Sequence, residues 1–92
     1  MPLYTFMMEY AGGTYISQIK APSPKSACLK WAKSLDISQI GGMRDKSKQS
    51  LLEQMKEEKP VPLDGLLNAW CVTAYLRRGL VLINLIKTES EK

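Results

Sequence analysis

The fold is decided by residues 69–86, which read Ala69-Trp70-Cys71-Val72-Thr73-Ala74-Tyr75-Leu76, then Arg77-Arg78-Gly79, then Leu80-Val81-Leu82-Ile83-Asn84-Leu85-Ile86. Two runs rich in β-branched and apolar residues around a glycine-containing turn are typical of an antiparallel hairpin. Apolar side chains fall on both faces of this hairpin, although a strand of a small antiparallel sheet usually buries only one face. The pattern therefore predicts surplus apolar surface that a partner covers.

An Arg78-Gly79 turn would set the register of this hairpin and separate its two faces. The more apolar face is expected to pack on helices and carries Trp70, Val72, Ala74, Leu76, Val81, Ile83 and Leu85. On the reverse face Tyr75 would lie opposite Leu82, and polar residues interrupt the apolar ones. We therefore predict a protein interface on the reverse face, formed by Tyr75, Leu80, Leu82 and Ile86.

A second hairpin is expected near the start of the chain, where the β-rich runs 4–10 and 14–20 flank Ala11-Gly12-Gly13. A Gly12-Gly13 loop would supply the positive φ angles of a tight turn and would place Tyr10 opposite Tyr15. Alternation then gives this hairpin one apolar face for the core and one mostly polar face.

Two helices are expected between the hairpins. Ser23-Pro24 predicts a helix start, with a hydroxyl N-cap and a proline at the first helical position, and this helix should run to about Leu35. Asp45 is expected to cap the second helix, which runs to about Glu58 before two prolines. The first helix has one continuous apolar stripe, whereas the second has only three firm apolar residues and should be held weakly on the core.

Two hairpins that bracket two helices predict one α+β domain over residues 1–88, in the order ββααββ. The two antiparallel hairpins would form a sheet with both helices on one face, and residues 89–92 would be a disordered tail. The pattern leaves the strand order open. It also leaves open whether a partner, the tail, or Leu66 and Leu67 cover the outer face of the second hairpin.

Composition limits the classes of function. The 92 residues suffice for one domain, and no secretory leader or membrane-spanning run is evident, so we expect a soluble cytoplasmic protein. The formal net charge is +4, and its excess between residues 22 and 60 forms no continuous basic stripe. Cys28 and Cys71 are expected to be buried free thiols.

Catalytic and metal-binding constellations are not evident. The chain has no histidine, which removes the usual zinc sites and Cys-His nucleophile pairs. The paired carboxylates of Glu53 and Glu57 are typical of a solvated helix face, and serines lack the contexts of known nucleophiles. We therefore predict no enzyme, with no catalytic residue, metal ligand or cofactor site.

One segment suggests an alternative function. Ile37-Ser38-Gln39-Ile40-Gly41-Gly42-Met43-Arg44, which leads into the second helix, resembles part of a helix-hairpin-helix element. The resemblance implies backbone N–H groups that contact a DNA phosphate, although Arg44 and Lys48 stand where the motif has a glycine and a small residue. The candidate nucleic-acid contacts are Gly41, Gly42, Arg44 and Lys46.

The first hairpin and helix suggest two further interpretations. Residues 4–35 resemble the opening of HicB-like antitoxin domains, but that family's Pro-Gly-Cys segment and its glycine-containing turn before the helix are missing here, so no functional residue is carried over. A small-molecule pocket between sheet and helices would be lined by Tyr4, Tyr10, Tyr15 and Trp31.

The sequence therefore favours a small non-enzymatic interaction module that self-associates as a homodimer, with another protein partner as a possibility. The alternative is a nucleic-acid-binding protein that uses the Gly41-Gly42 loop and nearby basic residues. Neither interpretation involves a membrane.

Overall fold

The structure, a computed structural model, describes residues 1–89. Its elements, in chain order, are β1 (Leu3–Tyr10), β2 (Gly13–Lys20), α1 (Pro24–Ser34), the short 3-10 helix η1 (Ile37–Gln39), α2 (Asp45–Glu57), β3 (Val61–Pro62), β4 (Ala69–Leu76) and β5 (Gly79–Glu89). The predicted α+β class and the order of hairpins and helices are confirmed, and the short strand β3 is added before the second hairpin.

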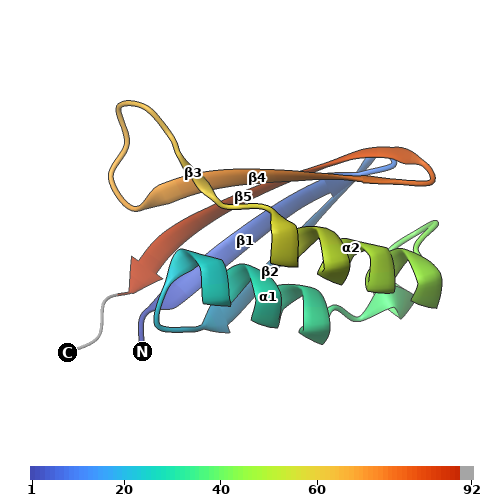
Figure 1. The fold of residues 1–92 in the computed structure, drawn as a ribbon, viewed down its shortest axis with the longest axis horizontal. Helices are drawn as coiled ribbons and strands as arrows, with labels where there is room; N and C mark the ends of the chain where they lie inside the picture. Colours follow the sequence, from blue (N-terminus) through green and yellow to red (C-terminus); the bar gives the residue numbers. More distant parts are fainter. Residues whose placement is uncertain (90–92) are drawn as a thin grey trace.

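The five strands form one antiparallel sheet in the order β2-β1-β5-β4-β3, and both helices lie on one side of it (Figure 1). The two hairpins join through β1 and β5, so strands from opposite ends of the chain become the centre of the sheet. Both of these strands carry apolar residues on both faces, of which one faces the helices and the other faces away from them (Figure 1).

The core lies between the sheet and the helices. Buried side chains alternate along β1 at Tyr4, Phe6, Met8 and Tyr10, as the period of two requires. Trp31 of α1 is 1% exposed and stacks on Phe6 with ring centroids 5.1 Å apart and planes 6° apart. Trp31 lies on the apolar stripe that the sequence predicts for this helix, so its burial against the sheet is as expected.

The loop of the first hairpin differs from the prediction. Tyr10 pairs with Gly13, so the two loop residues are Ala11 and Gly12 rather than Gly12 and Gly13. Ala11 has a φ of 49° and Gly12 a φ of 82°, as a two-residue hairpin loop requires. Positive φ is less favourable for Ala11 than for a glycine, because alanine has a Cβ. Because the register moves by two residues, each side chain keeps its predicted face although its partner changes.

The second hairpin shows the same shift. Leu76 pairs with Gly79, so the loop consists of Arg77 and Arg78, and Tyr75 lies opposite Leu80 rather than Leu82. Gly79 has a φ of 117°, a value that residues with a Cβ rarely adopt, and it resumes the strand after the two arginines. The prediction of an Arg78-Gly79 turn was therefore wrong in register and correct in the assignment of faces.

Helix α1 begins as predicted, whereas the start of α2 differs. Ser23 is the N-cap of α1 and forms a capping box with Ser26, in which each hydroxyl accepts from the other residue's backbone N–H. Asp45 is the first residue of α2 rather than its cap; the N-cap is Arg44, whose side chain makes no capping hydrogen bond. A carboxylate in the first turn still interacts favourably with the helix dipole.

Polar contacts hold α2 more firmly than its three apolar residues suggest. Lys25 of α1 donates from Nζ to the carbonyls of Met55, Lys56 and Glu58 at the end of α2, and Lys48 donates to the carbonyl of Leu35. The Gln54 amide donates to the Tyr75 carbonyl at 2.7 Å and accepts from the Tyr75 N–H at 2.8 Å. Gln54 thus occupies the edge of β4 beyond the short β3, where unpaired backbone groups would otherwise invite another strand.

The end of the chain differs in one respect. Strand β5 continues to Glu89, whose backbone pairs with Leu3, so the ordered strand enters the segment predicted as a tail. Residues 90–92, the remainder of that segment, lie outside the described residues. In the part of the chain described, no helix is long and apolar enough to cross a membrane.

Both cysteines are free, and Cys71 is only half-buried, whereas Cys28 lies in the core on α1. Burial raises the pKa of the Cys28 thiol to about 12, although the nearby Lys25 ammonium opposes the shift. We therefore expect iodoacetamide at about pH 8 to alkylate Cys28 more than about a thousandfold more slowly than an unperturbed thiol. Peptide mass spectrometry measures this rate, and rapid labelling of Cys28 in the native protein would contradict its burial. Labelling in guanidinium is the control, because unfolding should restore the ordinary rate.

Candidate functional site

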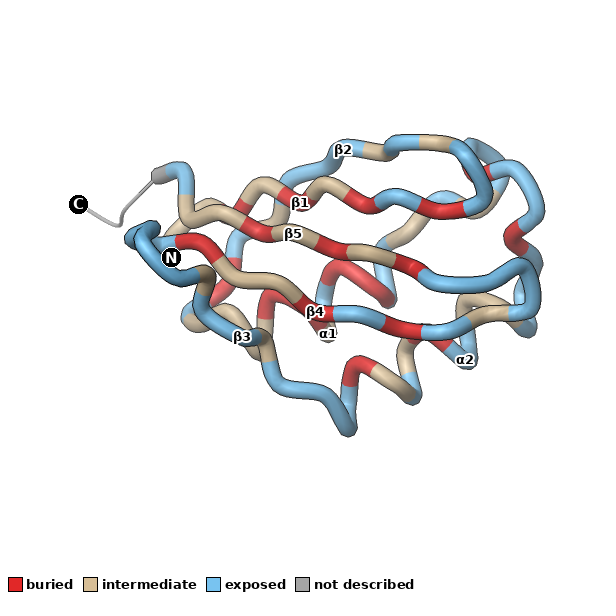
Figure 2. Tube along the Cα trace, turned by 90° about the horizontal axis from the view of Figure 1, so that it is seen from above, coloured by how far each residue is buried: buried red, intermediate tan, exposed pale blue. Residues whose placement is uncertain are grey.

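The outer face of the sheet, defined as the side opposite the helices, is covered by no helix in residues 1–89 (Figures 1 and 2). The strand registers place these residues on it: Leu3, Thr5, Met7, Glu9, Thr14, Ile16, Gln18, Lys20, Val61, Ala69, Cys71, Thr73, Tyr75, Leu80, Leu82, Asn84 and Ile86. Glu9 and Lys20 are the charged residues of this set, and the register also pairs Glu89 with Leu3 at one end of the face, whereas the chain has 13 basic and 9 acidic residues. Such segregation of charge is typical of a surface that excludes water in an assembly.

The four residues predicted to form an interface all lie on this outer face. Tyr75 and Leu80 are paired across the strands and are 69% and 48% exposed. Leu82 and Ile86 are half-buried nearer the centre of the sheet, where Leu82 is flanked by Glu9 of β1. The structure therefore places the four residues on one face of the sheet, with Thr73 and Asn84 between them.

The outer face is larger than the predicted set. Ile16 on β2 and Val61 on β3 are 67% and 61% exposed, and Met7 on β1 lies between β2 and the second hairpin. Four of the seven exposed large apolar residues in the described chain, Ile16, Val61, Tyr75 and Leu80, thus share this face. The alternation of β1 and β2 indicates their faces, but only the strand order shows that they continue the same surface.

The loop between β3 and β4 does not bury its own leucines against this face. Leu66 and Leu67 are 61% and 91% exposed, and their loop projects beyond the sheet on the side away from the helices (Figure 1). Within residues 1–89 the outer face is therefore open, and these leucines add apolar surface at its margin.

A second surface, the basic groove, lies between the start of α2 and the turn of the second hairpin. It has a volume of about 1230 Å³ and is lined by Gly42, Arg44, Asp45, Lys46, Ser47, Ser50, Tyr75, Leu76, Arg77 and Arg78. Four cations and one carboxylate give this lining a net charge of +3, compared with +4 for the whole chain. The excess positive charge is therefore concentrated at one place that the linear sequence does not reveal.

The predicted nucleic-acid contacts divide between this groove and its surroundings. Gly42, Arg44 and Lys46 line the groove, whereas Gly41 does not, and the Gly41 N–H is donated to the Tyr15 hydroxyl at 3.3 Å. The segment before the loop is the three-residue η1 rather than a full helix. The Gly41 N–H is therefore already engaged within the chain, and its contact with a phosphate stays a prediction.

Arg78 connects the hairpin turn to the glycine loop. A Cβ added to Gly42 would lie 2.7 Å from Cδ and 2.9 Å from Nη1 of Arg78, so the arginine side chain lies directly against the glycine backbone. Gly42 also has a φ of 80°, which favours glycine. The sequence does not indicate that Arg77 and Arg78 belong to the basic groove, because these residues follow Gly42 by more than thirty positions.

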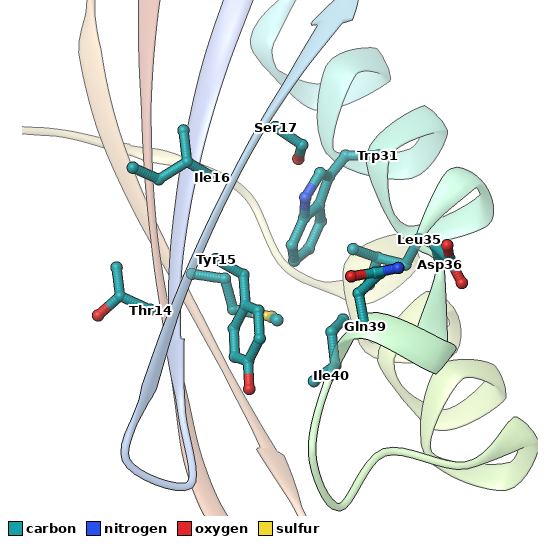
Figure 3. Close-up of a pocket in the computed structure, with 10 residues that line it drawn as sticks. Thr14, Tyr15, Ile16, Ser17, Trp31, Leu35, Asp36, Gln39 and Ile40 are labelled. Atoms are coloured by element: carbon teal, nitrogen blue, oxygen red, sulfur yellow. The ribbon is translucent and has the colours of Figure 1, made fainter.

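A third candidate, a cavity of about 390 Å³, lies between β2, the end of α1 and η1 (Figure 3). Tyr15 and Trp31 line it as predicted, whereas Tyr4 and Tyr10 do not. Figure 3 shows Tyr15, Trp31 and Gln39 directed toward the space between strand and helices. Asp36 at its rim accepts hydrogen bonds from the Ser38 hydroxyl and N–H, which hold the pKa of its carboxyl below the usual value. Its carboxylate is thus already engaged within the chain.

No group of three His, Cys, Asp or Glu side chains that could hold a metal ion occurs in the described ranges. Comparison of this chain with protein-family models, curated proteins and solved structures gave no match. The outer face and the basic groove are therefore the two candidate functional surfaces of the described chain.

Proposed function

We propose that this protein is a non-enzymatic interaction module that self-associates as a homodimer, with the outer faces of two sheets packed against each other. The observation that supports this proposal is the open outer face, where four of the seven exposed large apolar residues of residues 1–89 gather and charged residues are few. Removing such a surface from water is favourable, at about 25 cal/mol for each Å² of apolar area.

The size of the outer face suits a dimer. Four long strands about 4.8 Å apart, each about 26 Å long, present roughly 500 Å² in projection. Two copies would together bury about 1000 Å² or more, since corrugated side chains add to the projected area, and this reaches the lower limit of specific protein interfaces. The exposed leucines of the β3–β4 loop would add to it.

The two charges on the outer face favour a second copy over an unrelated partner. Glu9 lies near the turn of the first hairpin, and Lys20 lies at the other end, opposite Leu3. A two-fold axis across the strands would bring the Glu9 end of one sheet onto the Lys20 end of the other, twice. The face is thus complementary to itself in charge as well as apolar character.

The variant Leu82→Lys tests the proposal. A lysine at this position would lie beside Glu9 in the monomer, where an opposite charge is tolerated, but in the dimer it would bury a further cation in an apolar interface, at the end of the face that meets the partner's Lys20 end. We expect the wild-type protein to have twice the mass of one chain in light scattering at micromolar concentration. The dissociation constant should rise at least about 100-fold in Leu82→Lys.

Gln49→Lys is the matched control, because it adds the same charge to an exposed position of α2, on the opposite side of the molecule. It should remain dimeric, and circular dichroism should show that both variants are folded. A wild-type monomer at high micromolar concentration would overturn the proposal, as would a folded Leu82→Lys protein that dimerises as tightly as Gln49→Lys.

A further inference from the structure

We infer that the basic groove binds single-stranded nucleic acid, through a site that the hairpin turn and the start of α2 form together. Its cations come from two elements: Arg44 and Lys46 from the start of α2, and Arg77 and Arg78 from the turn between β4 and β5. Cations on both walls of a groove suit a chain of phosphates that passes between them.

The four cations are available to a ligand. Among residues 1–89, none of them forms an ion pair or a side-chain hydrogen bond, and Asp45 is the one carboxylate in the lining. Outside the groove, four of the eight lysines in residues 1–89 donate to oxygen atoms of the protein: Lys25, Lys30, Lys48 and Lys56. Unpaired cations that converge on one groove raise the local concentration of an anionic ligand.

The walls of the groove are fixed by the fold. The Gln54 amide joins α2 to the backbone of Tyr75 through two hydrogen bonds, and this connection sets the separation between α2 and the edge of β4. On the other side Arg78 lies against the bare backbone of Gly42. The cationic side chains therefore project from a frame that needs little rearrangement to bind.

The shape and lining of the groove favour a single strand. Its volume of about 1230 Å³ exceeds the range of about 300–1000 Å³ typical of enclosed small-molecule sites. Tyr75, 69% exposed, is among the lining residues, so an aromatic side chain on which an unpaired base can stack lies at the margin of the groove. The hydroxyl-bearing Ser47 and Ser50 add donors suited to phosphate oxygens.

Fluorescence anisotropy with a labelled mixed-sequence DNA strand of about 12 nucleotides tests this inference. We expect binding at about 50 mM salt that weakens with a slope of log K against log salt of about −3, as four phosphate contacts to a single strand require. The double variant Arg77→Gln/Arg78→Gln should bind at least tenfold more weakly and with about half that slope.

Two further variants make the test specific. Lys33→Gln/Lys59→Gln removes the same charge at exposed positions outside the groove and should bind within about twofold of wild type. Tyr75→Leu keeps an apolar side chain for the outer face but removes the ring, and should weaken binding about tenfold.

Several results would overturn the inference. One is the absence of binding at low salt, and another is an equal loss of affinity in the two double variants. A third is full affinity in Tyr75→Leu. The fourth is a DNA duplex or polyglutamate that competes as well as the single strand. The arginines lie outside the outer face, so dimerisation measured in parallel by light scattering should be unchanged in Arg77→Gln/Arg78→Gln. The arginine variants therefore test the groove independently of the proposed homodimer, whereas Tyr75 belongs to both surfaces.

Discussion

Replacing Trp31 with alanine is expected to lower the free energy of unfolding by about 3–5 kcal/mol, more than Trp70→Ala or Lys25→Met. Trp31 is 1% exposed and stacks on Phe6, so its removal leaves a large cavity between α1 and β1 and deletes a ring contact. A domain of this size has a stability of about 5–15 kcal/mol, so this loss is a large fraction of the total.

Urea denaturation followed by circular dichroism measures this loss, and the Leu82→Lys background removes any contribution from dimer dissociation. Trp70→Ala is the matched control: Trp70 is half-buried on β4, and its ring is tilted by 60° against Tyr4 at 5.9 Å. Trp70→Ala should lower the free energy of unfolding by about half as much as Trp31→Ala, since folding withdraws less of the Trp70 side chain from water. Equal losses in the two variants would contradict the central position of Trp31.

The second prediction concerns Lys25, which should contribute about 2–3 kcal/mol although it lies near the surface. Its ammonium donates to the carbonyls of Met55, Lys56 and Glu58 at the C-terminal end of α2. These residues follow Lys25 by 30, 31 and 33 positions. A cation at this end of a helix also interacts favourably with the helix dipole. Lys25→Met keeps the apolar stem and removes the ammonium, so the decrease in the free energy of unfolding measures the contribution of these hydrogen bonds.

Hydrogen exchange locates this effect. In Lys25→Met the amides in the last two turns of α2 should exchange faster, while those of β1 and β5 should change only by the global loss of stability. Lys33→Met removes a charge from an exposed position of the same helix and should cost less than about 0.5 kcal/mol. Similar stability losses in Lys25→Met and Lys33→Met would show that the three hydrogen bonds contribute little.

Several parts of the fold could be predicted from local patterns. The start of α1 at Ser23-Pro24 follows from the chemistry of a hydroxyl cap and a proline without an N–H. The inward faces of both hairpins follow from alternation, and they survive a shift of two residues in each register because the period of a strand is two. The registers themselves depend on which residues form each tight loop, and a run such as Ala11-Gly12-Gly13 allows two solutions.

The candidate sites were predictable to different degrees. The four residues predicted for the outer face lie on a single hairpin, so alternation alone places them on the same side: Tyr75, Leu80, Leu82 and Ile86. Ile16 and Val61 join them only because β1 pairs with β5 and β3 pairs with β4. One wall of the basic groove, with Gly42, Arg44 and Lys46, comes from a local segment, but Arg77 and Arg78 join it only through tertiary packing.

By itself the sequence therefore determined the elements, their inward faces and an apolar excess on the second hairpin, because these depend on residues within a few positions of one another. Only the tertiary structure decided the strand order, the polar attachment of α2 through Lys25 and Gln54, and the convergence of four cations at one groove. The physical reason is that these features depend on contacts between distant segments, which form only when the helices and both hairpins bury their apolar faces in one common core.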